Sequence, residues 1–262
     1  MVIHHCRGNN RAAVIINFLA LTVSRISAIL KLHMRALSAI ILLVALALPS
    51  GHVLASPPIN ISAENLQLLQ AKAAQGDERA QETLGWIYAN GLGLPEDYTK
   101  AKQWYEKAAT QGNATAQAAL GLLYSQGQGM PKDYTKARQW FEKAAAQGDA
   151  QARLALGLYF ATGTGVPQDY GKARQWFEQA ASQENPQAQF YLGGLYYDGH
   201  GVPKDIVRAY MWFNLATTYA MGDEKEVAVE NRDAIAKQLS PAELAEAQRL
   251  AQQCQARQFK GC

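Results

Sequence analysis

Few residues of this 262-residue chain are placed for catalysis. Four of its five histidines precede residue 56, namely His4, His5, His33 and His52. The fifth, His200, stands between Gly199 and Gly201, at a variable loop position where the other units have Leu92, Gln128 and Thr164. We expect His200 to be a solvated loop histidine.

Other catalytic patterns are missing as well. No serine is followed three positions later by lysine, so the chain lacks the nucleophile pattern of penicillin-recognising hydrolases. Neither His-Glu-x-x-His nor Cys-x-x-Cys occurs, and these are the spacings that hold zinc. The sequence therefore predicts no catalytic residue, no metal site and no cofactor.

Cys254 and Cys262 are the only cysteines after residue 55, and they lie eight positions apart at the C-terminus. In an oxidising compartment they can pair, provided that the last helix ends by about Gln258. The alternative is two free, unrelated thiols.

The charge of the chain is divided unevenly. Residues 1–55 contain five basic residues and no Asp or Glu, which leaves 20 basic and 22 acidic residues after them. The net charge of +3 therefore comes from residues 1–55. The slightly acidic remainder of the chain argues against nucleic acid as a partner.

Residues 34–55 have the features of a signal peptide. Arg35 precedes an apolar run from Ala36 to Leu48, and small residues at Val53 and Ala55 predict cleavage before Ser56. This run is shorter than the roughly 20 apolar residues of a membrane span. Residues 1–33 are then a non-native upstream extension or a disordered leader. The alternative is a membrane segment within Ala12–Leu30, which would tether an uncleaved chain.

The remainder of the chain repeats with a constant step of 36 residues. The landmarks that recur are a glycine (Gly85, Gly121, Gly157, Gly193), a proline (Pro95, Pro131, Pro167, Pro203) and a tryptophan (Trp104, Trp140, Trp176, Trp212). A fixed period of this length is typical of stacked helical units.

Each unit is predicted to contain two helices. In the first unit, Asp77 caps a helix from Glu78 to about Asn90, Gly91 ends it, and Asp97 caps a second helix from about Tyr98 to Thr110. On the first helix, Ala80, Leu84, Ile87 and Tyr88 form one buried stripe. Trp104 and Tyr105 form the buried side of the second helix.

The motifs A-x-x-x-L-G-x-x-Y, G-x-G, P-x-D-Y-x-K-A and W-aromatic-x-x-A-A-x-Q-G resemble the Sel1-like repeat, a subtype of the tetratricopeptide-like helical repeats. This resemblance implies an all-α, right-handed α/α solenoid. We expect an N-terminal capping helix in 56–76, four repeats in 77–221, and a pair of C-terminal capping helices in 222–262. Ser240, Pro241 and Glu243 mark the start of the last helix.

The first-helix positions opposite the buried stripe vary between units, and many are apolar. They include Trp86, Leu122, Leu154, Leu158, Phe190 and Tyr191, with Arg79, Glu82 and Asn90 at the rim. Such residues predict a concave groove that binds a partner helix or an extended peptide. The alternative is packing between neighbouring first helices or against the terminal helix.

The resemblance implies a non-enzymatic adaptor or regulator at the cell envelope, periplasmic or secreted, which binds another protein or peptide. Two alternatives remain. One is a secreted β-lactamase-like hydrolase, although the paired cysteines of such cysteine-rich relatives are missing from the units here. The other is a membrane-tethered periplasmic assembly factor that retains its leader.

Overall fold

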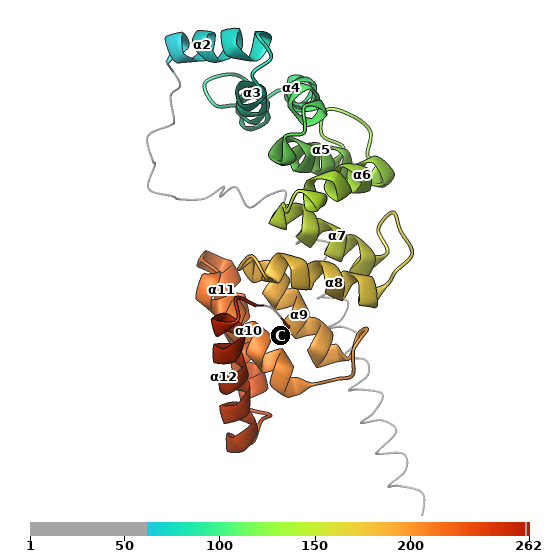
Figure 1. The fold of residues 1–262 in the computed structure, drawn as a ribbon, viewed down its shortest axis with the longest axis vertical. Coiled ribbons are helices and arrows are strands. Elements are labelled where there is room, and N and C mark those ends of the chain that lie inside the picture. The colour runs from blue at the N-terminus through green and yellow to red at the C-terminus, as the bar shows by residue number, and fades with distance from the viewer. Residues whose placement is uncertain (1–61, 260) are drawn as a thin grey trace, which may run out of the picture. The chain divides into compact units, whose positions relative to one another are not determined.

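The computed structural model describes residues 62–259 and 261–262, and all regular structure within them is α-helical (Figure 1). The helices are α2 (Ala63–Ala74), α3 (Glu78–Asn90), α4 (Tyr98–Thr110), α5 (Ala114–Gln126), α6 (Tyr134–Ala146), α7 (Ala150–Thr162), α8 (Tyr170–Ala181), α9 (Pro186–Asp198), α10 (Ile206–Tyr219), α11 (Gly222–Ala236) and α12 (Pro241–Ala256). The predicted upstream extension, signal peptide and cleavage site lie outside the described residues.

The capping residues begin and end the helices where the sequence predicts. The carboxylate of Asp77 accepts a hydrogen bond from the backbone amide of Ala80 at 2.7 Å, and Gly91 ends α3 with φ 64°. Asp97 accepts from the amide of Lys100 at 2.9 Å, and this bond holds the pKa of Asp97 below its ordinary value. The predicted bounds of α3 and α4 are thereby confirmed.

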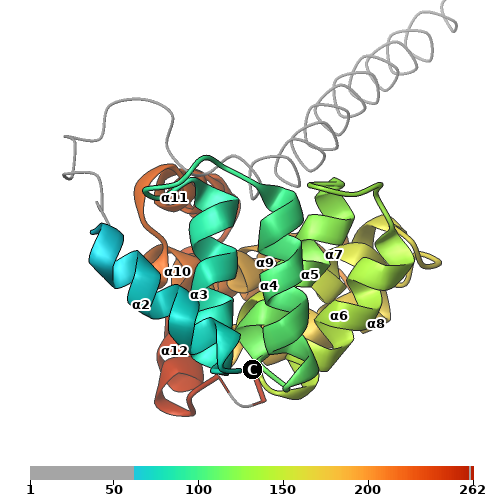
Figure 2. The ribbon, with the colours of Figure 1, turned by 90° about the horizontal axis from the view of Figure 1, so that it is seen from above.

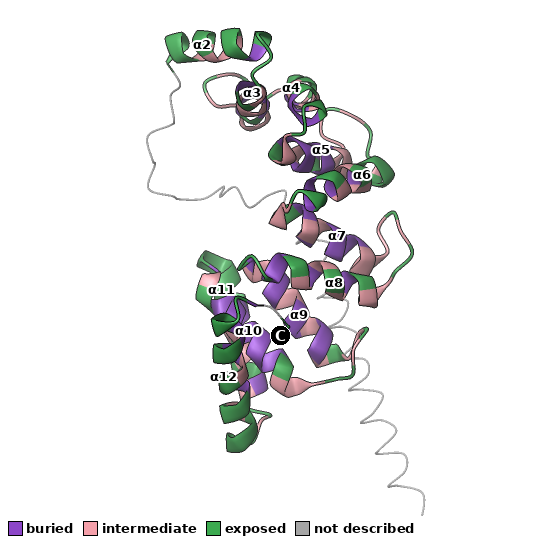
Figure 3. Ribbon diagram, in the orientation of Figure 1, coloured by how far each residue is buried: buried purple, intermediate pink, exposed green. Residues whose placement is uncertain are grey.

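Helices α3 to α10 form four pairs, each made of a first helix and a second helix, and each pair packs on the next. Figure 2 shows that successive pairs are turned relative to one another rather than stacked in line. Buried positions gather where helices face each other, whereas much of α2, α11 and α12 is exposed (Figure 3). The protein is therefore an α-solenoid of four helix pairs between capping helices.

A glycine in each first helix allows the close approach of its second helix. A Cβ atom built on Gly121 would lie 2.5 Å from Cε1 of Phe141, and one built on Gly85 would lie 2.6 Å from Cδ1 of Tyr105. The aromatic rings thus occupy the space that any side chain would need.

Side chains of the first helices also hydrogen-bond to the preceding second helix. The side chain of Gln81 donates to the carbonyl of Ala73 at 3.0 Å, that of Gln117 to the carbonyl of Ala109 at 3.1 Å, and that of Arg153 to the carbonyl of Ala145 at 3.3 Å. At the equivalent position in α9, Gln189 is fully buried and its amide has no partner among the described residues. The last junction between units therefore depends on apolar packing.

The apolar core is distributed unevenly along the array. The first three clusters each centre on one junction, and each contains a few buried side chains. The fourth cluster is much larger and extends from Leu154 and Leu158 in α7 to Phe259 after α12. Most of the continuous core therefore lies in the C-terminal half of the described chain.

Two helices follow the fourth unit within the expected 222–262 segment, and α11 and α12 each pack on α10. The start of α12 is as predicted, because Ser240 and Glu243 form a capping box behind Pro241. The outer side of α10 explains the position of α12. There, Met211 and Leu215 are fully buried, where α4 has the exposed residues Gln103 and Lys107.

Candidate functional site

The exposed part of the predicted groove lies on α3 and α5. Trp86 is 43% exposed and Leu122 is 37% exposed, and they occupy equivalent positions on these neighbouring first helices. Arg79 is exposed and Asn90 is half-buried at the same side of α3. We call Arg79, Glu82, Trp86, Asn90 and Leu122 the open patch.

Short side-chain hydrogen bonds support the helix backbone beneath the open patch. The side-chain amide of Asn90 donates to the carbonyl of Trp86 at 2.8 Å, and the hydroxyl of Ser125 donates to the carbonyl of Leu122 at 2.8 Å. These polar groups are therefore used within the helices. Among the described residues, parts of the Trp86 and Leu122 side chains remain exposed.

The charge of the open patch is balanced. Arg79 and Glu82 are its only ionisable residues, and burial raises the pKa of Glu82, whereas a hydrogen bond involving Thr83 acts in the opposite direction.

The other half of the predicted groove is not open, which corrects the sequence prediction. Leu154 is 3% exposed and Leu158 is 9% exposed, and both belong to the large C-terminal core cluster. Phe190 and Tyr191 are half-buried and pack against that same cluster. For these four residues, the alternative of packing within the array is the correct interpretation.

Aromatic contacts explain why the groove closes at α9. The ring of Tyr191 stacks on Phe177 with centroids 5.2 Å apart, and Phe190 meets Phe213 edge-on at 5.1 Å. Burial raises the pKa of Tyr191 to about 12, and the charge of Glu224 in α11 adds to this effect. These bulky rings fill a position where α5 carries Ala118 and Ala119.

His200 lies in a loop as predicted, but its ring is not free in solvent. It stacks on Tyr170 with centroids 4.4 Å apart and planes 8° apart, while 43% of its side chain is exposed. In the described residues, no group of three or more His, Cys, Asp or Glu side chains is arranged to hold a metal ion. None of the helices described here has the length and apolar character needed to cross a bilayer.

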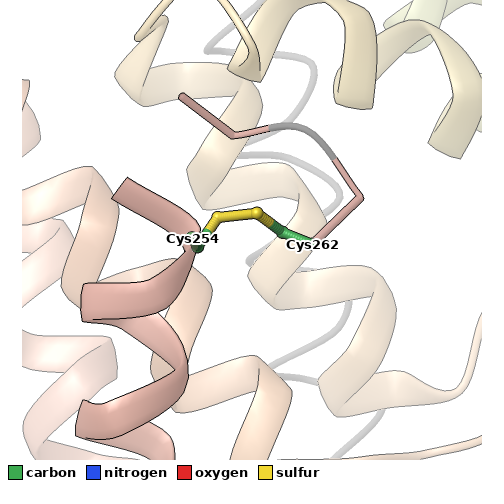
Figure 4. The surroundings of a disulfide bond; sticks show 2 residues. All are labelled: Cys254 and Cys262. Carbon is green, nitrogen blue, oxygen red and sulfur yellow. A yellow bond between two sulfur atoms is a disulfide. The ribbon is translucent and has the colours of Figure 1, made fainter. Parts of the chain in front are cut away.

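The structure joins Cys254 and Cys262 in a disulfide, with the two Cα atoms 5.5 Å apart (Figure 4). Helix α12 ends at Ala256, before Gln258, so the chain has room to turn back. The alternative of two unrelated free thiols does not describe this structure.

The period, the helix pairs and the partly exposed first helices define a class of protein, the α-solenoids that act as scaffolds. The Sel1 repeat family model matches residues 79–113, 114–149, 148–185 and 186–218, which together make up more than half of the chain. The chain therefore belongs to the Sel1 repeat family. Proteins of this family generally mediate protein–protein interaction, and their fold is typically a non-enzymatic scaffold.

Two solved structures share both sequence and fold with this chain. A protective antigen of uropathogenic Escherichia coli with an SLR fold is 36% identical, with a TM-score of 0.68, and the match covers 75% of this chain and 42% of the antigen. A Sel1 repeat protein from Oxalobacter formigenes is 36% identical, with a TM-score of 0.55, and the match covers 60% of this chain and 64% of that protein. In both cases the match spans less than two thirds of the other chain. A comparison with curated protein sequences gave no match.

Proposed function

We propose that this protein is a non-enzymatic scaffold of the cell envelope that binds another protein or peptide through the open patch. The observation that carries the proposal is the exposure of Trp86 and Leu122 at adjacent equivalent positions, 43% and 37% respectively. Large, exposed apolar side chains that lie next to one another are a recurrent feature of protein–protein interaction surfaces. The family, whose members act in protein–protein interaction, supports the same function.

The burial of the other predicted groove residues, Leu154, Leu158, Phe190 and Tyr191, distinguishes them from the open patch. In α7 the equivalent residue, Leu158, is 9% exposed and belongs to the core, and in α9 the equivalent position is Gly194, which has no side chain to contact a partner. In α3 and α5 the described residues leave Trp86 43% exposed and Leu122 37% exposed. The partner segment is therefore expected to be short, spanning two first helices.

We further propose that the protein is exported and acts after cleavage before Ser56. The basic start and apolar run of residues 34–55 support export, and the disulfide between Cys254 and Cys262 is of a kind that persists in oxidising compartments. Mass spectrometry of the protein purified from cells that express the full chain should give a mature form that begins at Ser56. A purified form that retains Ala36–Leu48 would contradict cleavage and support the membrane-tethered alternative.

Replacing both Trp86 and Leu122 with alanine should reduce partner capture by tenfold or more, because truncating a buried aromatic contact residue typically costs about 2 kcal/mol or more of binding free energy. Affinity capture from an extract of the native cell envelope, quantified by mass spectrometry against the wild type, measures this loss. The melting temperature should change little, since both side chains are already partly in solvent.

Leu68 provides the matched control for this experiment. It is 55% exposed but lies on α2, outside the open patch, so Leu68→Ala should leave capture unchanged. Equal capture by the wild type and by the Trp86→Ala, Leu122→Ala variant would show that the open patch is not the binding surface. Loss of capture in the Leu68 variant would move the surface to the N-terminal helix.

A further inference from the structure

The residues after α12 have an unfavourable backbone conformation, which other contacts must stabilise. Gln258 has φ 51° and Phe259 has φ 60°, so two consecutive residues with side chains lie in the left-handed region. This region is unfavourable for residues other than glycine, and it is rarely adopted twice in succession. A free tail would leave this conformation.

Two contacts hold Phe259 in place. Its backbone amide donates to the carbonyl of Cys254 at 2.9 Å, and its side chain is 7% exposed within the large core cluster. Its ring meets that of Tyr219 edge-on, with centroids 6.1 Å apart. An aromatic residue three positions before Cys262 is thus part of the core.

Tyr219 is the last residue of α10, so Phe259 covers the C-terminal end of the fourth unit's second helix. The hydroxyl of Tyr219 donates to the carboxylate of Glu184 at 3.2 Å, in the turn between α8 and α9. The tail therefore protects a point where three successive helices meet.

We propose that the disulfide between Cys254 and Cys262 is a redox-sensitive latch that keeps Phe259 on the end of α10. The disulfide closes the tail at both sides of Phe259, as Figure 4 shows for the two cysteines. While the bond is present, the strained residues cannot extend into solvent. When it is broken, the backbone relaxes, the ring leaves its site, and an apolar surface around Tyr219 becomes exposed.

A dithiol reductant opens the latch in two exchange steps. Its thiolate attacks the sulfur of Cys262, which is the more exposed cysteine, while the sulfur of Cys254 is the leaving thiolate and takes up a proton. The second thiol of the reductant then displaces the Cys262 thiolate, which is also protonated. Two electrons pass to the protein, and the reductant leaves as its cyclic disulfide.

Hydrogen–deuterium exchange of the exported protein, with and without dithiothreitol, tests the latch. The amide of Phe259 should be protected in the oxidised protein and exchange at least tenfold faster after reduction. The amides of α3 and α5 should exchange at the same rate in both conditions, because those helices are far along the chain from the tail. Equal protection of Phe259 before and after reduction would overturn the proposal.

Two variants separate the latch from simple loss of fold. The Cys254→Ser, Cys262→Ser protein should show the fast exchange of Phe259 without reductant, and dithiothreitol should have no further effect on it. Phe259→Ala should keep the disulfide but expose the end of α10, so a hydrophobic dye should bind this variant as it binds the reduced wild type. Peptide mapping that finds Cys254 and Cys262 unlinked in the oxidised protein would also refute the latch.

Discussion

Replacing Leu154 with aspartate should lower the free energy of unfolding by about 4 kcal/mol or more, enough to unfold much of the C-terminal half. Leu154 is 3% exposed and lies in the core cluster that joins α7 to the C-terminal helices. The change removes apolar contacts and places a carboxylate where nothing pairs with it. Circular dichroism at increasing temperature measures the loss.

Leu122→Asp is the matched control, since Leu122 also lies on the inner side of a first helix but is 37% exposed. Its carboxylate can reach water, so the free energy of unfolding should change by no more than about 1 kcal/mol. The Leu122 variant should therefore be folded but poor at partner capture. If Leu154→Asp melts like the wild type, then Leu154 is open to solvent and the closed half of the groove has been assigned wrongly.

Gly121→Ala should destabilise the protein by about 1–3 kcal/mol, although alanine is normally the better helix residue. The new Cβ would lie 2.5 Å from Cε1 of Phe141. That ring cannot move aside freely, because it is buried and the ring of Tyr159 meets it edge-on at 5.8 Å. The helix pair must therefore separate, with loss of packing along its length.

Gly194→Ala tests this explanation by making the same substitution where there is space. Gly194 is also helical, in α9, and apart from its chain neighbours and its own helix backbone no atom of the described residues lies within 4 Å of a Cβ built on it. This variant should be more stable than the wild type by up to about 1 kcal/mol. Opposite signs for the two variants in chemical denaturation would support the packing argument, and two changes of equal sign would contradict it.

Much of the fold could be predicted because each unit repeats its own local signals. Asp77, Gly91 and Asp97 begin or end helices through contacts within a few residues, and those contacts depend little on the rest of the chain. The constant period then places equivalent side chains at equivalent junctions. The pairing of Cys254 with Cys262 could be proposed for a similar reason, since it needs only a short turn.

The candidate site could be predicted only in part. The helical period places Trp86, Leu122, Leu154 and Leu158 on one side of the first helices, but it does not say what covers them. Exposure depends on tertiary packing: Leu154 and Leu158 lie in the large core cluster, against which Phe190 and Tyr191 also pack, whereas Trp86 and Leu122 belong to no cluster of the described residues. Such packing involves residues far apart in the sequence, and the helical period alone does not predict it.

The packing of α12 on α10 was not predicted, although the sequence of α10 indicates it. Residues equivalent to the solvated Gln103 and Lys107 become Met211 and Leu215 in the fourth unit, which marks an outer face that needs cover. Comparing each unit's polar side with its counterparts would have found this signal. The stacking of His200 on Tyr170 had no comparable signal, because it depends on loop geometry.

The uneven distribution of the apolar core along the array affects how ligand binding would change the local stability of the protein. In a repeat array, neighbouring units open and close in partly independent steps, and the N-terminal units rest on the smaller clusters. If a ligand binds α3 and α5 as we propose, its occupancy would suppress fraying of those N-terminal units by mass action. Binding would then be measured as greater rigidity of the first two units, whereas the large C-terminal core would be unaffected by the ligand.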